Sequence, residues 1–186
     1  MVRRPYLVGH QEFAALYDVR AQMVQQWLNR GVLDPGTAVV VSGVRYWPLG
    51  FACRFGETTP RPKALNAAVK QRLMEAQGEG WLAESPGELP AIVGQQEIVA
   101  LFHLPAQGNV ATTIATGRFP ASDWVLSGSG LWLLDTVLGA VDDLRKSARS
   151  LAWEADEQVA AALRDGTYDG PGSAVLTRGR YARKAL

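Results

Sequence analysis

The amino-acid sequence contains the same pattern twice, and this internal repeat limits the fold more than any other feature of the chain. Residues 8–17 are VGHQEFAALY, and residues 93–102 are VGQQEIVALF. The identical residues lie 85 positions apart, so that Gly9, Gln11, Glu12, Ala15 and Leu16 match Gly94, Gln96, Glu97, Ala100 and Leu101. A repeat of this length predicts two copies of one small structural unit.

The match continues beyond these two stretches. Val41-Ser42-Gly43 corresponds to Leu126-Ser127-Gly128, and Trp47 corresponds to Trp132, again 85 positions later. Between them, a shift of one residue aligns Val24 and Gly31 with Val110 and Gly117. The 186 residues have room for two such units. We therefore expect two domains, residues 1–85 and residues 86–186.

Composition predicts a folded protein, because 47% of the residues are apolar and 20% are charged. No stretch of about 18 apolar residues is present, so no segment is expected to span a membrane. The single cysteine, Cys53, excludes an intramolecular disulfide and a cysteine-rich zinc site. We expect a cytoplasmic location.

The net charge of +1 hides an asymmetry between the two halves of the chain. Residues 1–72 carry ten Lys and Arg against four Asp and Glu, a net charge of +6, whereas residues 73–186 carry nine against fourteen, a net charge of −5. A positive first half favours a polyanionic partner such as nucleic acid, since neutralised phosphates supply most non-specific affinity.

The first copy has the pattern of two short helices followed by a hairpin. Apolar spacing predicts one helix over 10–17 and a second over 20–30, ended by Gly31. A β-hairpin turning at Ser42-Gly43 is expected over 38–47. A short helix over 49–55, a long helix over 63–77 and a linker over 78–90 complete the prediction.

The second copy repeats this order. We expect helices over 92–102 and 105–117, a hairpin over 123–134 and a predominantly helical stretch over 133–165. The expected fold class is therefore mainly α with small β-hairpin wings. The last segment contains four basic residues: Arg178, Arg180, Arg183 and Lys184. They predict either a phosphate-contacting arm or a solvated terminus, and we favour the solvated terminus.

The helix and hairpin segments of the two copies resemble the winged helix-turn-helix of the MerR and phage-excisionase type. The resemblance covers residues 6–55 well and residues 91–135 more weakly. Its pattern is carried here by Glu12, Phe13, Ala14, Val24, Trp27, Arg30, Gly31, Val32, Leu33, Pro35 and Trp47. It implies two tandem winged helix-turn-helix modules with additional long helices, and double-stranded DNA as the partner.

In such a fold the second helix enters the major groove of DNA. Gln pairs with adenine and Arg with guanine through bidentate contacts. The expected base-contacting side chains of the first copy point away from its apolar stripe: Arg20, Ala21, Gln22, Gln25, Gln26 and Asn29. An ordinary solvated helix surface is the alternative. We expect Arg30 at phosphates and Arg45 at phosphates or in the minor groove. Arg3 and Arg4 resemble an arm that binds the minor groove.

The second copy departs from the pattern. Thr113 replaces Trp27, the hairpin lacks an equivalent of Arg45, and Arg118 is the one basic residue in 91–132. Its candidate DNA contacts are Gln107, Asn109, Thr112, Thr113, Thr116 and Arg118. This copy either binds DNA weakly or has another use.

No feature of the sequence points to an enzyme. Phosphate-binding loops, nucleophile elbows and metal motifs are absent from the sequence. His10 and His103 do not align between the copies and have no acidic or cysteine partner at ligand spacing, so no metal, cofactor or catalytic residue is expected. Trp47 and Trp132 are expected in the core.

The sequence thus predicts a prokaryotic, sequence-specific transcriptional regulator, for which a phage or plasmid origin is one hypothesis. It would bind double-stranded DNA as a monomer or a homodimer, and no small-molecule ligand is implied. One alternative keeps DNA binding but assigns a partition, recombination or architectural role. Another gives the second copy a protein partner such as RNA polymerase.

Overall fold

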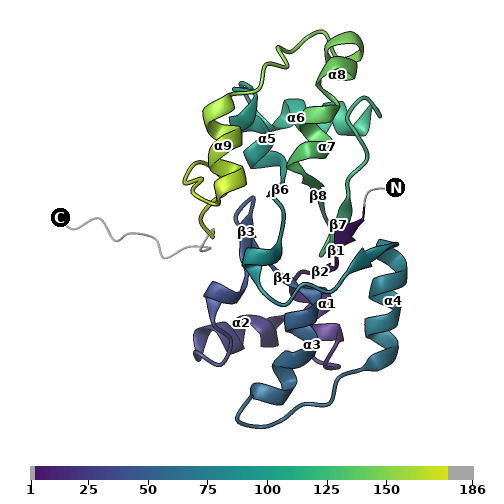
Figure 1. Cartoon of the computed structure of the whole chain (residues 1–186), viewed down its shortest axis with the longest axis vertical. Coiled ribbons are helices and arrows are strands. Elements are labelled where there is room, and N and C mark those ends of the chain that lie inside the picture. The colour runs from purple at the N-terminus through teal and green to yellow at the C-terminus, as the bar shows by residue number, and fades with distance from the viewer. Residues whose placement is uncertain (1–2, 176–186) are drawn as a thin grey trace, which may run out of the picture.

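Two lobes, one from each repeat, meet at a pair of small β-sheets in the computed structural model of the chain, which describes residues 3–175 (Figure 1). The structure is mixed α and β, with short helices around small, mainly antiparallel sheets. None of the helices in the described part is long and apolar enough to cross a membrane.

The first lobe follows the predicted order of elements. Its elements are β1 (Arg4–Pro5), β2 (Leu7–Val8), α1 (His10–Ala15), α2 (Ala21–Asn29), η1 (Pro35–Thr37), β3 (Val39–Val41), β4 (Val44–Pro48), α3 (Leu49–Thr58) and α4 (Ala67–Gln77). Helix α2 ends as expected before Gly31, whose φ of +70° is accessible to glycine without strain. Two predicted boundaries were wrong. Helix α3 continues to Thr58, and α4 begins only after Asn66, whose side chain accepts a hydrogen bond from the Val69 N–H.

The second lobe repeats the order strand, two helices, hairpin and helix that runs from β2 to α3, and then continues with two further helices. Its elements are β6 (Ile92–Val93), α5 (Gln95–Leu101), α6 (Gln107–Ala115), β7 (Trp124–Leu126), β8 (Ser129–Leu133), α7 (Leu134–Gly139), α8 (Val141–Ser147) and α9 (Glu157–Asp165). The expected helical stretch over 133–165 is broken into these last three helices, at Ala140 between α7 and α8 and by a non-helical segment at 148–156 between α8 and α9. The linker over 78–90 also contains regular structure, β5 (Gly80–Trp81) and η2 (Pro86–Glu88).

The sheets have matching topology in the two lobes. Strand order is β2-β4-β3 in the first and β6-β8-β7 in the second, both antiparallel, while β1 pairs in parallel with β5. The predicted hairpin turn at Ser42-Gly43 is present, with φ of +48° and +78°, and Ser127-Gly128 has φ of +47° and +79°. Both turns have the positive φ pair of type I′ hairpins.

The structural repeat extends further than the sequence repeat. The Asn66 N–H donates to the Leu16 carbonyl at 2.8 Å, and the Asp156 N–H donates to the Leu101 carbonyl at 2.8 Å. Asn66 also contacts Asp18, and Asp156 contacts His103, which is the repeat partner of Asp18. Asp156 thereby gives His103 an acidic neighbour that sequence spacing did not predict. Helices α4 and α9 therefore begin in the same way, 90 positions apart.

Three hydrophobic clusters stabilise the part of the chain that the structure describes. One draws its buried residues from Tyr6 to Val69 of the first repeat, and another from Val93 to Ala160 of the second. Trp47 and Trp132 lie in these two clusters, as predicted. The third is shared, because Leu7, Val41 and Tyr46 pack against apolar residues of the second repeat: Ile92, Trp124, Leu126, Leu131 and Leu133. The two sheets therefore bury their inner faces against each other.

Candidate nucleic-acid interface

Helix α2 has one buried face and one polar face. Val24 and Trp27 are buried, and Met23 and Leu28 are half-buried against the same cluster. Arg20 precedes the helix, Arg30 follows it, and Ala21 is half-buried in its first turn. Of the residues predicted from the spacing to point away from the core, Ala21 is half-buried and the others are exposed: Arg20, Gln22, Gln25, Gln26 and Asn29. Arg30 is exposed as well.

The exposed glutamines differ in their contacts. The Gln25 side-chain amide donates to the Asn29 side-chain oxygen at 2.9 Å, one helical turn later. This bond fixes the orientation of the Gln25 amide on the helix surface. Gln22 and Gln26 are exposed on the same helix, and we regard them as the strongest candidates for base contacts.

A basic hollow lies beside the end of α2, and the sequence analysis missed two of its residues. Arg61 and Lys63, from the segment between α3 and α4, join Arg30 around an apolar floor that includes Met23 and Trp27. The Lys63 ammonium lies 5.7 Å from the centroid of the Trp27 ring, which is a cation–π distance. The sequence shows these two basic residues in the Arg-Pro-Lys stretch at 61–63, but it does not show that the stretch lies beside α2 in the folded chain.

The equivalent helix α6 presents a nearly uncharged surface. Gln107, Thr112, Thr116 and Arg118 are exposed, and Asn109 is half-buried. Thr113 is buried, and its hydroxyl donates to the Asn109 carbonyl at 2.8 Å. The prediction of a DNA contact at Thr113 was therefore wrong, because this position faces the core as Trp27 does in the first repeat.

The second lobe has no tryptophan in α6 at the position of Trp27 in α2. Trp153 lies in the core of this lobe instead. In the first lobe Trp27 packs against Tyr17, with ring centroids 6.3 Å apart. Phe102, the repeat partner of Tyr17, packs instead against Trp153 at 5.2 Å. The segment at 148–156, which interrupts the predicted helical stretch, thus supplies an indole to the core of the lobe in which Thr113 replaces tryptophan.

The turn of each hairpin is bound by the first helix of the other lobe. The Ser127 N–H and hydroxyl each donate to the Glu12 carboxylate at 2.7 Å. In the same way the Ser42 N–H and hydroxyl donate to Glu97, at 2.7 and 2.6 Å. We call these two contacts the hairpin latch. Gly43 is also buried, and its N–H donates to the Gly172 carbonyl at 2.9 Å.

Arg45 lies on β4 opposite Val40, two residues before the buried Trp47. His10 packs edge-on against Trp47, with ring centroids 5.1 Å apart. Burial lowers the pKa of His10, and the positive charge of Arg45 lowers it further. Arg45 therefore lies close enough to the start of α1 to act on His10, and it stands two residues after Gly43 of its own hairpin turn.

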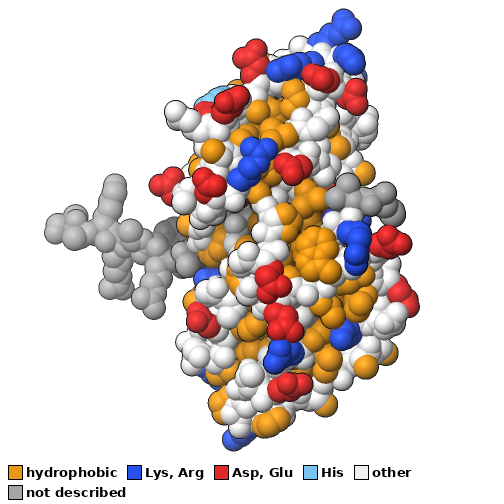
Figure 2. Space-filling model, in the orientation of Figure 1, with side chains coloured by type: hydrophobic (Ala, Val, Ile, Leu, Met, Phe, Trp, Pro, Cys, Tyr) orange, Lys and Arg blue, Asp and Glu red, His pale blue; other side chains and the backbone are white. Residues whose placement is uncertain are grey.

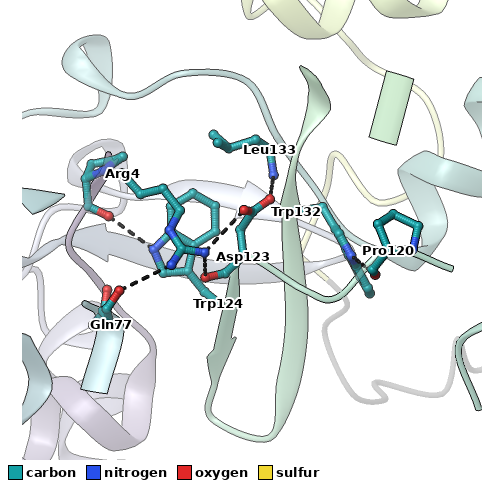
Figure 3. Close-up of polar contacts among 8 residues, drawn as sticks. Arg4, Gln77, Pro120, Asp123, Trp124, Trp132 and Leu133 are labelled. Atoms are coloured by element: carbon teal, nitrogen blue, oxygen red, sulfur yellow. Dashed lines mark hydrogen bonds and ion pairs between the residues drawn. The ribbon is translucent and has the colours of Figure 1, made fainter. Parts of the chain in front are cut away.

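Of the two arginines expected in an N-terminal arm, Arg4 is held inside the molecule. Its guanidinium donates to the backbone and side chain of Asp123 and to the Gln77 carbonyl, and it lies over the Trp124 ring (Figure 3). Only 19% of the Arg4 side chain is exposed, so the expected role in a DNA-binding arm was wrong. Arg3 is exposed and reaches the Gly80 carbonyl at 3.3 Å.

The surface charge in one view is mixed. Figure 2 shows Lys and Arg interspersed with Asp and Glu, with apolar side chains between them. Within residues 3–175 no group of three or more His, Cys, Asp or Glu is placed to hold a metal ion. The basic residues of the last segment, from Arg178 to Lys184, lie outside the described residues.

Comparison of the chain with protein-family models, with curated proteins and with solved structures gives no match.

Proposed function

We propose that the chain is a sequence-specific regulator of transcription that binds double-stranded DNA and inserts α2 into the major groove. The polar face of α2 is the observation that carries this proposal. It offers Gln22 and Gln26 for bidentate contacts with adenine, and Arg20 and Arg30 at the two ends for guanine or phosphate. The apolar face packs into the lobe, so the helix is supported from behind as groove recognition requires.

The charges of the first lobe support the same proposal. The basic hollow adds Arg61 and Lys63 beside Arg30, at the end of the proposed recognition helix. Cations in this position suit phosphates, and phosphate contacts fix the register of a protein on the duplex without reading its sequence. We assign Arg61 and Lys63 to that role.

The hairpin latch changes the expected use of the wings. Winged helices place the tip of the hairpin against DNA, but here each turn is bound by a glutamate of the opposite lobe. Our proposal therefore relies on α2 and the basic hollow, and it assigns no minor-groove contact to Arg45. The tandem winged helix-turn-helix organisation remains part of the proposal.

The second lobe has a different surface, which favours a second candidate function for that lobe. The exposed residues of α6 are uncharged, including Gln107, Ala111, Thr112 and Ala115. Such a face lacks the cations that supply most affinity for DNA. It suits a protein partner, with the first lobe binding DNA. Partition, recombination and architectural roles use the same docking surface and remain alternatives for the whole chain.

Selection from a random duplex library tests these assignments with intact chains. A fragment containing only residues 1–85 is unsuitable, because it would expose Leu7, Val41 and Tyr46 of the shared cluster. We would compare the natural chain with two double variants, Gln22→Ala/Gln26→Ala in α2 and Gln107→Ala/Thr112→Ala in α6.

The proposal predicts an enriched motif that the α2 variant loses. If the α6 variant loses a separate half of the motif, both lobes read DNA. If the α6 variant enriches the full motif, the second lobe is not a reader and the partner-binding role is favoured. Absence of any motif, with binding that only follows salt concentration, would exclude the sequence-specific regulator and favour an architectural role.

A further inference from the structure

A cavity of about 360 Å³ lies at the junction of the two repeats. Strand β3 of the first lobe forms one wall, and the segment leading into β6 forms another. The end of α9 and the turn that follows it close the third side, contributing Arg164, Tyr168 and Ser173. We call this cavity the repeat pocket. Its volume falls within the usual range for small-molecule sites, which often lie between domains.

The repeat relationship shows what fills the equivalent position in the other half of the molecule. The Leu49 N–H donates to the Tyr6 carbonyl at 2.8 Å, and its repeat partner Leu134 donates to the Ala91 carbonyl at 2.9 Å. The same shift of 85 residues relates three wall residues of the pocket to residues of the opposite half: Val39, Leu89 and Pro90 correspond to Trp124, Arg4 and Pro5.

In the opposite half this position is occupied by an indole ring. Trp124 is only 2% exposed, and its ring N–H donates to the Pro5 carbonyl at 3.1 Å. The Arg4 guanidinium lies 5.7 Å from the centroid of the same ring (Figure 3). Val39 puts an isopropyl group where Trp124 puts this ring, and Leu89 replaces the cation. The repeat pocket is therefore the unfilled counterpart of the Trp124 site.

The walls offer an apolar surface for an aromatic ring, and the Glu97 carboxylate that also lines the pocket is engaged by its hydrogen bonds from Ser42 and Gly94. Val39 and Leu89 pack against the apolar cluster between the sheets and supply an apolar surface for a ring. Pro90 carries the carbonyl that corresponds to the acceptor of the Trp124 N–H. Arg164 supplies a cation, and its side chain is 53% exposed and paired with the exposed Asp135 at 3.4 Å. A weak surface pair of this kind is readily exchanged for a ligand carboxylate.

We propose that the repeat pocket binds a small planar aromatic carboxylate that carries a ring N–H, such as an indole carboxylate. The ring lies between Val39 and Leu89, the N–H donates to the Pro90 carbonyl, and the carboxylate pairs with Arg164. This inference is independent of DNA binding. It departs from the expectation, drawn from the sequence, that no small-molecule ligand is implied.

Isothermal titration of the full chain with indole-3-acetate and with indole tests the proposal. Saturable binding to one site is expected for both, with indole-3-acetate tighter. Arg164→Gln should weaken indole-3-acetate about two- to fivefold, the loss expected for one half-exposed charge contact, and leave indole unchanged. The proposed contacts should give binding that is detectable at ligand concentrations up to about 5 mM. The proposal would be overturned if neither compound gave saturable heat in this range.

A filling variant locates the site. Val39→Trp copies the occupied half, so it should abolish binding while the thermal unfolding midpoint is kept or raised. Val125→Trp places the same side chain on β7, where Val125 is 69% exposed, and should bind as the natural chain does. If Val39→Trp does not fold, changes in the NMR amide shifts of the natural chain locate the binding site. Shifts induced by indole-3-acetate must centre on 39–41 and 89–92, and a centre elsewhere would exclude this site.

Discussion

Glu97 binds three donors with one buried carboxylate, and two of them belong to Ser42 in the other repeat. The Ser42 N–H and hydroxyl lie 2.7 and 2.6 Å from its oxygens, and the Gly94 N–H at the start of α5 lies 3.0 Å away. Glu97 is 2% exposed. The contact joins a hairpin turn to a helix start 55 positions later, and Glu12 repeats it with Ser127 in the opposite direction.

The latch explains why the two copies share the residues that first reveal the repeat. Gly9, Glu12 and Ser42 are identical in both copies, and all of them take part in the contact. The Gln11 and Gln96 N–H groups also donate to the hydroxyls of Ser127 and Ser42. The repeated signature therefore encodes the joining of the two lobes as well as the fold of each one.

Removing the Glu97 carboxylate should destabilise the whole chain. Glu97→Ala leaves the Ser42 and Gly94 N–H groups without their acceptor in a buried place, at a cost of about 2–4 kcal/mol in the free energy of unfolding. Glu12→Ala should cost less, about 1–2 kcal/mol, since Glu12 is half-buried. Urea unfolding measures both. Glu79→Ala, at an exposed position, is the control and should stay within about 0.5 kcal/mol. A Glu97 variant as stable as this control would exclude a stabilising latch.

Two glycines should respond in opposite directions to the same substitution. A Cβ atom on Gly94 would overlap the Ser42 hydroxyl, with Val41 also close, whereas a Cβ atom on Gly108 meets nothing within 4 Å. Gly94→Ala should therefore lower the free energy of unfolding by about 1–3 kcal/mol, because the hairpin must move away. Gly108→Ala, in α6, should raise it by up to about 1 kcal/mol, because alanine favours helix. Equal effects of the two substitutions would contradict the close approach at Gly94.

Local signals predicted most of the elements. The spacing of Val24 and Trp27 indicated the buried face of α2, and Ser-Gly pairs marked both hairpin turns. These features depend on residues close in sequence, where periodicity and turn preference are informative. The exposed glutamines of α2 were predictable for the same reason.

Contacts between distant residues were not predictable. Arg4 appeared to belong to a basic arm because its partner Asp123 lies 119 positions away. Trp153 replaces an indole that Thr113 lacks, and no local pattern shows this substitution. The common start of α4 and α9 was missed because Asn66 and Asp156 are different residues at a different spacing. In each case the deciding contact is made only after the chain has folded.

The position of Arg45 can be tested through the titration of His10. Burial, and then the charge of Arg45, lower the pKa of His10 from its ordinary value of 6.5. The NMR titration midpoint of His10 should therefore lie below 6.5. Arg45→Gln should raise this midpoint without restoring the ordinary value, because burial remains the larger cause. Arg145→Gln, in the other lobe, should leave it unchanged. An Arg45 variant with an unmoved midpoint would show that Arg45 does not lie beside His10.

The lowered pKa of His10 also determines how this residue changes the free energy of unfolding with pH. The folded state binds the proton on His10 less readily than the unfolded chain, so protonation favours unfolding. This contribution leaves the free energy of unfolding constant above about pH 6.5 and reduces it as the pH falls from there to the lowered pKa of the folded state. Urea unfolding of the natural chain and of His10→Gln over this range should show a smaller loss in the variant. An equal loss in both chains would contradict this sign.

Base contact by α2 predicts that loss of one glutamine affects specific and non-specific DNA differently. Gln22→Ala or Gln26→Ala should weaken binding to the selected site by about 1–3 kcal/mol, because each removes a bidentate contact to a base. Binding to random DNA should hardly change, since phosphates supply that affinity.

Lys63→Gln should instead weaken binding to both kinds of DNA about equally and reduce the slope of affinity against salt by about one. Gln71→Ala, exposed on α4, is the matched control for loss of a surface glutamine. Competition binding at several salt concentrations measures these effects. If the α2 variants behave like Gln71→Ala, the glutamines are ordinary surface residues and α2 is not the recognition helix.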